Sequence, residues 1–387
     1  MNEATEQTVR VAAQSIYDTI VDAVDEDDTH ARWQTADYRS GEMKYQPQLH
    51  TGVAGIGLFL ADYGRVLKDA RALELAGKGL VWAQGADNDE FWTKIDDGSA
   101  WRVSLAYGVA GAGLAWLRLA QATDDPQILQ RVVDCADYLL TADPAAKPGL
   151  MIGTAGCAIF LLRLFEQTGE AAYLQRAQEW GHHILDDHLD KHDYLGMGQG
   201  LAGIGHLGFI LKDVTGDENW DELVHRTATR LIEHAEPDRG HLNWRKTLSD
   251  SEISRCHWCH GGAGVGQFFA RAYEHSSKEQ YLEMAIAAGE TTYAYGDDRQ
   301  NPSQCHGLAG KAELFVDLAR VTGESVWDVR LAEFVDLIAT YRHDTETGVQ
   351  WQADEPGLYS PELVCGSSGV GHFLLRLIDP QLRMPFL

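Results

Sequence analysis

Hydrophobic and polar positions follow a helical period along most of the chain, and this pattern restarts seven times. Apolar runs such as CAIFLLRLFEQ and KAELFVDLARV have the spacing of helices that are amphipathic or wholly buried. Each run follows a Gly-x-(Ala/Ser)-Gly motif, and the first glycines of the motifs are Gly52, Gly108, Gly153, Gly200, Gly261, Gly307 and Gly366. The pattern therefore predicts seven equivalent helices that start at these motifs.

A second helix is predicted after several of these runs. Thr168-Gly169, Thr215-Gly216 and Thr322-Gly323 end a helical run, and an acidic residue that suits a new helix start follows each glycine. The repeating unit is a helical hairpin of roughly 45 to 60 residues, which predicts an all-α protein. Such an array is an open solenoid or a closed ring, and periodicity fits both. The first 30 residues predict one outer helix and an exposed loop.

Composition places the chain among soluble globular proteins, because 44% of its 387 residues are hydrophobic and 23% are charged. We expect a single domain over residues 1–387. The net charge of −26 makes this an acidic protein that would repel nucleic acid. The sequence begins without a signal-peptide pattern and has no apolar stretch of membrane-spanning length, which predicts a cytoplasmic protein with no membrane span.

The motif glycines themselves have two interpretations. Residues without a side chain let backbones approach closely at a helix start, which makes the glycines packing devices. Exposed N–H groups at the same helix start would instead bind an anion. We favour packing for most repeats.

Candidate chemistry lies in repeats five and six, where the motif is preceded by Cys-His in Trp258–Gly264 and Gln304–Gly310. Six cysteines in so long a chain predict buried thiols or metal ligands rather than a disulfide scaffold. Cys259, Cys305 and His306 form a Cys₂His set, which would hold a catalytic zinc with one open position. His260 and His257 are alternative ligands or neighbours of the metal. The contrasting interpretation is a buried Cys and a hydrogen-bonded His at each helix start.

These motifs resemble those of the lanthionine synthetase C-like proteins, and the resemblance covers nearly the whole chain. Its most specific parts are W-C-H-G-x-x-G, from Trp258, and C-H-G-x-x-G, from Cys305. The resemblance implies an (α/α)7 toroid, a double ring of seven inner and seven outer helices. It also implies a Zn²⁺ ion held by Cys259, Cys305 and His306, with Arg255 assisting catalysis. A surface salt bridge is the alternative role of Arg255.

The resemblance also implies an activity. Cyclases of this family add a peptide Cys thiol across a dehydroalanine or dehydrobutyrine and form a thioether. Zinc lowers the pKa of a bound thiol, and thiolate ligands keep the resulting nucleophile electron-rich. The enolate that forms then needs a positioned acid.

The positions for that acid differ in this chain. Gln199 stands where the cyclases have a His in the fourth repeat, and Gly149 stands where they have an Asp in the third. Gln199 can still donate a hydrogen bond to an enolate oxygen, and His260 or His257 are candidates for the proton transfer. His192 and Asp193 are further candidates if their loop folds inward, although we expect it to be solvated.

Three functions are consistent with these features. The first is zinc-dependent addition of a thiol to a dehydroamino acid in a peptide or protein, with the thiol coming from the same peptide or from a small thiol such as glutathione. The second is a non-catalytic peptide-binding scaffold that keeps the metal. The third is a carbohydrate-active enzyme, in which tryptophans would stack on sugars, namely Trp92, Trp101, Trp244, Trp258 and Trp351. It leaves the Cys-His pairs unexplained.

Overall fold

The computed structural model describes residues 3–85, 100–143, 147–346 and 348–387, and most of these residues are helical. Two compact units share the chain. Unit 1 contains Met1–Ala142, Gln300–Gln304 and Val335–Leu387, and unit 2 contains Asp143–Arg299 and Cys305–Phe334. The single domain expected over residues 1–387 stays a prediction.

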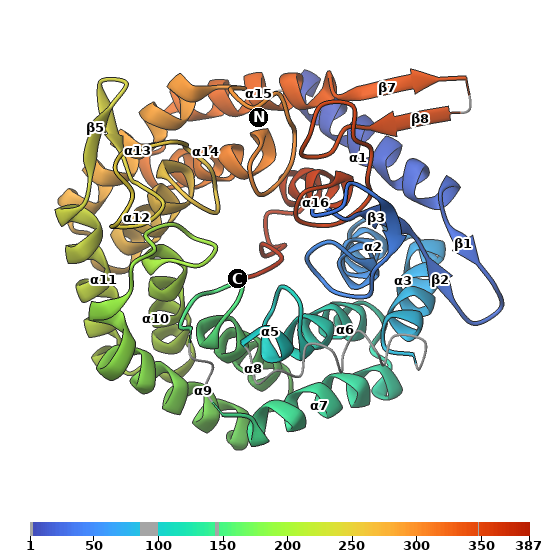
Figure 1. Ribbon diagram of the computed structural model, residues 1–387, viewed down its shortest axis with the longest axis horizontal. Helices are drawn as coiled ribbons and strands as arrows, with labels where there is room; N and C mark the ends of the chain where they lie inside the picture. The colour runs from blue at the N-terminus through green and yellow to red at the C-terminus, as the bar shows by residue number, and fades with distance from the viewer. Residues whose placement is uncertain (1–2, 86–99, 144–146, 347) are drawn as a thin grey trace. The chain divides into compact units, whose positions relative to one another are not determined.

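Helical hairpins make up most of unit 1. The helices α2 and α3 pack side by side, as do α6 and α7 (Figure 1). Their bounds are Val53–Leu67 for α2, Ala70–Ala83 for α3, Val109–Thr123 for α6 and Pro126–Thr141 for α7, with the short α5 at Ala100–Val103. The unit also contains α1 at Glu3–Asp22 and α16 at Ser367–Ile378.

Unit 2 continues the same arrangement. Its hairpins are α8 with α9, α10 with α11, and α12 with α13, followed by α14. The bounds are Thr154–Thr168 for α8, Ala171–His183 for α9, Leu201–Thr215 for α10, Asp221–Glu233 for α11, Gly262–Ser276 for α12, Glu279–Tyr295 for α13 and Leu308–Thr322 for α14. A π-turn η2 (Ile184–His188) and a 3₁₀ turn η3 (Leu189–Lys191) extend α9, and η4 (Glu218–Trp220) precedes α11. The division between the units falls within α15 (Ser325–Ala339).

The first and last repeats meet inside unit 1. The last inner helix, α16, packs on α2, which is the inner helix of the first repeat. The N-terminal helix α1 packs on α16 and takes the place of its outer partner, which confirms the expected outer helix at the N-terminus.

Burial separates the inner helices from the outer ones. Each residue of α2 from Val53 to Gly64 is buried, whereas α7 buries only Val132, Cys135, Ala136 and Leu139. A helix that is apolar all round belongs in a core, and a helix with one apolar stripe belongs at its edge. The predicted helix starts and the all-α class are confirmed.

The motif glycines are required by close backbone approach. At Gly264, an added Cβ would lie 2.0 Å from the carbonyl oxygen of Trp258, six residues earlier. The same contact, at 2.0–2.1 Å, recurs at Gly55, Gly111, Gly203 and Gly369. Gly261 also has a positive φ of +120°, which L-residues rarely adopt. The loop before each of these inner helices is therefore folded tightly against the helix start, which supports the packing interpretation.

The inner helices other than α16 end in the left-handed conformation, whereas α16 ends at Asp379 with a φ of −121°. Gly169, Gly216 and Gly323 have φ of 71°, 68° and 67°, as the predicted stop signals require. The equivalent residues elsewhere are not glycine: Lys68, Asp124 and Ser277 have φ of 58°, 53° and 53°. These three residues therefore carry backbone strain that glycine would avoid.

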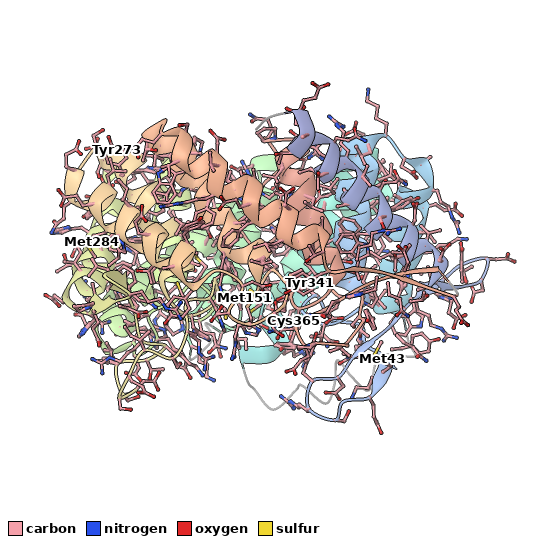
Figure 2. All side chains as sticks on the ribbon, turned by 90° about the horizontal axis from the view of Figure 1, so that it is seen from above. Met43, Met151, Tyr273, Met284, Tyr341 and Cys365 are labelled. Carbon is pink, nitrogen blue, oxygen red and sulfur yellow. The ribbon has the colours of Figure 1, made fainter. Side chains whose placement is uncertain are left out.

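Short β-hairpins were missed by the sequence pattern. The pairs are β1 with β2 (Asp25–Glu26, Ala31–Arg32), β3 with β4 (Gln34–Ala36, Met43–Tyr45), β5 with β6 (Glu236–Asp238, His241–Asn243), and β7 with β8 (Arg342–Thr345, Gly348–Trp351). Strands of two to four residues are too short to show alternation. The expected N-terminal loop therefore contains hairpins. Met43 on β4 is 40% exposed, and its place is labelled in Figure 2.

A buried carboxyl group ties the β3–β4 hairpin to the last repeat. Glu362 is fully buried and accepts short hydrogen bonds from the hydroxyl groups of Tyr38 and Ser360. The Ser360 hydroxyl also accepts a hydrogen bond from the backbone N–H of Ala36 at 2.9 Å. Burial raises the pKa of Glu362 to about 7, the two hydroxyl donors oppose the rise, and nearby Asp354 adds to it.

Candidate metal centre

Two loops of unit 2 carry the Cys-His-Gly triplets. Cys259–Gly261 directly precede α12, and Cys305–Gly307 directly precede α14, which packs against α12. The close approach of the motif glycines fixes the loop backbone, so equivalent positions of neighbouring repeats face the same region. Cys259 and Cys305 are each 6% exposed, and His306 is half-buried.

The donor atoms lie within the reach of one small cation. Potential ligand atoms of His257, Cys259 and His306 are all within 4.8 Å of one another. The Sγ atom of Cys305 lies 3.4 Å from Nε2 of His306, and the two thiols of Cys259 and Cys305 share a hydrogen bond. Two sulfurs and imidazole nitrogens at such separations are the donor set that zinc prefers. The residues therefore fit the zinc ion that the sequence predicts.

The structure separates the two histidines that the sequence left as alternatives. His257 is fully buried and belongs to the donor group, and its ring centroid lies 5.0 Å from that of His306. His260 is half-buried, and its ring lies 6.0 Å from Tyr194 instead. Burial lowers the pKa of both imidazoles.

Cys259 differs electrostatically from Cys135 and Cys157. The hydrogen bond from Cys305, together with nearby His306 and His260, holds the pKa of the Cys259 thiol well below its ordinary value, against the effect of burial. Burial instead raises the pKa of Cys157 to about 12 and that of Cys135 to about 11. All six cysteines lie among the described residues and are free thiols.

Asn243 organises the first loop, and sequence reasoning missed it. Its Oδ1 accepts hydrogen bonds from the backbone N–H groups of Gly262 at 2.7 Å and Trp244 at 2.9 Å. Its Nδ2 donates to the carbonyl of Arg255 at 3.1 Å. This fully buried amide therefore holds both ends of the loop that carries His257 and Cys259. Its position at the end of the short strand β6, 16 residues before Cys259, gave no local signal.

Lys311 is a second missed residue, one turn into α14. It is 1% exposed, and its Nζ donates to the carbonyl of Gly296 at 2.8 Å and to the carboxylate of Asp298. Burial lowers the pKa of His257 and the charge of Lys311 adds to this effect, whereas burial raises the pKa of Cys256 and the charge of Lys311 opposes the rise. A lysine inside the apolar run LAGKAELF was the available signal.

Gln199 lies on the loop of the fourth repeat, and its backbone occupies the space that a side chain at Gly149 would need. A Cβ added at Gly149 would lie 2.8 Å from the carbonyl oxygen of Gln199. His192 Nε2 donates to the same carbonyl at 2.7 Å, so the loop that we expected to be solvated folds inward. Burial lowers the pKa of His192. The neighbouring Asp193 accepts a hydrogen bond from Ser249 at 3.1 Å.

This loop also contacts the first Cys-His-Gly triplet. The backbone N–H of Gly198 donates to the carbonyl of Cys259 at 3.0 Å, and a Cβ added at Gly196 would meet that carbonyl oxygen at 2.3 Å. The glycine-rich sequence around Gln199 is therefore needed for close packing against a proposed metal ligand.

Arg255 lies at the start of the first loop. Its Nε donates to the hydroxyl of Ser254 at 3.1 Å, and among the described residues its guanidinium forms no ion pair with a carboxylate. The alternative role of Arg255, a surface salt bridge, is therefore not seen among the described residues. Burial lowers the pKa of His260, and the charges of Lys246 and Arg255 add to this effect.

The sequence of the chain matches a known protein family. The model of the family described as lanthionine synthetase C-like protein matches residues 44–387. The chain belongs to this family.

Individual relatives agree with the family match. This LanC-like protein is 28% identical over 191 residues to the zebrafish (Danio rerio) protein named Glutathione S-transferase LANCL1, and the match covers 49% of the chain but only 44% of that relative. The chain therefore spans less than half the length of this relative.

Similarity to solved structures concerns the fold. The structure of nisin cyclase has a TM-score of 0.61 at 16% identity, and the match covers 97% of this chain and 94% of the cyclase. Cellobiose 2-epimerase from Bacillus thermoamylovorans has a TM-score of 0.53 at 12% identity, covering 98% and 100% of the two chains. The predicted helical toroid fold is thus confirmed.

The tryptophans proposed for sugar stacking are in the core. Trp244, Trp258 and Trp351 are each at most 2% exposed, so their faces are not available to a ligand. Trp92 and the side chain of Trp101 lie outside the described part of the chain. Among the described residues, no helix combines the length and apolar character needed to cross a membrane.

Proposed function

We propose that this LanC-like protein uses a Zn²⁺ ion to activate a thiol and add it to a dehydroamino acid of a peptide or protein. The observation that carries the proposal is the convergence of Cys259, Cys305 and His306 from two helix starts. Zinc bound there would lower the pKa of a coordinated thiol and keep the thiolate electron-rich.

The reaction is balanced without an oxidant or a reductant. The thiol loses its proton and its sulfur forms a bond to the β-carbon of the dehydroamino acid. The double bond between the α- and β-carbons becomes a single bond, and the α-carbon gains a proton. Gln199, half-buried on the adjacent loop, is proposed to donate a hydrogen bond to the enolate oxygen. His260 is proposed to deliver the proton, and Arg255 to keep the site positively charged near it.

Two sources of the thiol are compatible with this chemistry. A Cys of the same peptide would give a ring, as the name of nisin cyclase suggests. A small thiol such as glutathione would give an adduct, as the name of the zebrafish relative suggests. We expect a cytoplasmic location, because six free cysteines suit a reducing compartment.

A second candidate function is a zinc-containing scaffold that binds peptides without turnover. The loop of Gln199 supports it, because its backbone excludes an acidic side chain at position 149, and His192 is already bonded to its carbonyl. Neither Gln199 nor Gly149 can transfer a proton.

Metal content tests the basis of both candidates. The purified protein should contain about one zinc per chain, and Cys305→Ala should lose it. Cys157→Ala, which removes a buried thiol from α8, is the matched control and should retain the metal. A wild-type protein without zinc after purification free of chelators would refute the proposal.

Turnover then separates the two candidates. The zinc-loaded protein is incubated with a dehydrated peptide that contains a Cys, or with glutathione and a dehydrated peptide without Cys. Thiol addition by glutathione adds its mass to the peptide, and ring formation makes the peptide resistant to thiol alkylation. Peptide binding with an unchanged acceptor would favour the scaffold.

A further inference from the structure

We propose that His257 is a fourth, displaceable ligand of the metal, so that the resting centre has two cysteine and two histidine ligands. The inference rests on the metal in the proposed function, but it changes what that centre is. The resemblance assigns three protein ligands and an open position, whereas a fourth ligand closes the centre until an incoming thiol displaces it.

Burial without partners is the first observation. His257 is fully buried, and neither Nδ1 nor Nε2 makes a hydrogen bond of normal geometry. Burial lowers the pKa of the imidazole and an interaction with the sulfur of Cys259 raises it, but among the described residues neither ring nitrogen has a nitrogen or oxygen partner. An unpaired buried polar group costs about 1–3 kcal/mol, so such a histidine indicates a partner that completes the site.

The position of His257 beside the other donors also supports a role as a ligand. A ligand atom of His257 lies within 4.8 Å of Cys259 Sγ and of a ring nitrogen of His306. In a tetrahedral site with Zn–S of about 2.3 Å and Zn–N of about 2.0 Å, ligand atoms are separated by about 3.3–3.8 Å. The grouped donors therefore lie close enough together for one metal ion to contact all of them.

Other partners for the ring are already engaged. Lys311, whose charge acts on His257, donates to Gly296 and Asp298. The neighbouring thiol of Cys256 lies 3.4 Å from the hydroxyl of Thr292. A cation between the three grouped donors is the partner that satisfies His257.

The loop presents His257 in a fixed direction. Its backbone N–H donates to the carbonyl of His260 at 3.0 Å, and Asn243 bonds the loop on both sides. His260, three residues later, is directed toward Tyr194 and stands outside the donor group. The two histidines thus offer a matched pair, in which one is a proposed ligand and the other is not.

Cobalt substitution tests the proposal with readouts that do not depend on activity. Co²⁺ is titrated alone into the metal-free wild type, His257→Ala and His260→Ala, and its visible spectrum and affinity are measured by competition with a chelator. We expect a four-coordinate spectrum in the wild type and in His260→Ala. His257→Ala should bind Co²⁺ at least tenfold more weakly and with a changed spectrum.

Glutathione added to the cobalt forms tests displaceability. Without His257 the thiol competes only with water, so half-saturation of the spectral change should need at least tenfold less glutathione in His257→Ala than in the wild type. An equal requirement in the two forms would refute displacement of His257.

Melting temperatures distinguish a packing role of His257 from a role as a metal ligand. The metal-free and metal-loaded forms of the wild type and His257→Gln are melted, because a lost ligand reduces the stabilisation that metal binding adds, whereas lost packing lowers both melting temperatures equally. Identical cobalt spectra and equal metal-induced stabilisation would overturn the inference while leaving the zinc proposal intact. A wild type that binds no Co²⁺ or Zn²⁺ would overturn both.

Discussion

Replacing Glu362 by Gln should remove a specific loss of stability that the wild type shows as pH rises. Glu362 is fully buried and accepts hydrogen bonds from Tyr38 and Ser360. Gln has the shape of the protonated acid, and its amide can donate to Ser360 and accept from Tyr38. The variant therefore keeps the contacts of the neutral form and loses only the ability to ionise.

The magnitude follows from the raised pKa. Burial raises the pKa of Glu362 from an ordinary value of 4.5 to about 7. The folded state holds this proton more tightly than the unfolded state, so its stabilisation is complete below about pH 4.5 and is lost as pH rises through about 7. This rise in pKa corresponds to about 3.4 kcal/mol, of which about 2.6 kcal/mol is lost between about pH 5 and pH 9.

Urea unfolding followed by circular dichroism over this pH range provides the assay. The informative quantity is the difference in unfolding free energy between Glu362→Gln and the wild type, because groups common to both cancel. The difference should move in favour of the variant by about 2–3 kcal/mol from about pH 5 to pH 9. Glu355→Gln makes the same substitution at an exposed position and should show a flat difference. A flat difference for Glu362→Gln itself would refute the reasoning.

Other predictions concern the core, the loops and the metal. Arg118→Met should lower the free energy of unfolding in urea by about 3–5 kcal/mol, because it removes the cation that lies 3.7 Å from the buried carboxylate of Asp62. Adding Asp62→Asn should recover much of the loss. Ser277→Gly should raise stability by about 0.5–1 kcal/mol by relieving a φ of 53°, and an unchanged melting temperature would contradict the strain. Gly264→Ala should cost more than about 3 kcal/mol and reduce zinc content, since its Cβ would meet a carbonyl oxygen at 2.0 Å. Chelation should lower the melting temperature of the wild type but not that of Cys305→Ala.

The repeated parts of the fold were predictable from the sequence because they are local. A Gly-x-x-Gly motif followed by an apolar run specifies a helix start, and a second glycine after the run specifies its end. Cys259, Cys305 and His306 were predicted to converge because they occupy equivalent motif positions, and the structure brings their side chains together.

Contacts between distant loops were not predictable. Tyr38 meets Glu362 across 324 positions of the chain, and no periodicity encodes that pairing. Asn243 and His192 bond to backbone carbonyls whose places depend on how loops of neighbouring helices stack. The short hairpins were missed because strands of two to four residues are too short to show alternation.

Because a motif glycine recurrently contacts the carbonyl six residues earlier, the backbone of the intervening segment is fixed while its side chains are free to differ. Five repeats have this contact at 2.0–2.1 Å, so their loop backbones are pinned at the same two points whatever side chains lie between. Repeat two carries Ala106 and Tyr107 where repeat five carries Cys259 and His260. A repeat can therefore gain candidate ligand side chains by substitution at these two positions, without a change in the helices that support the loop.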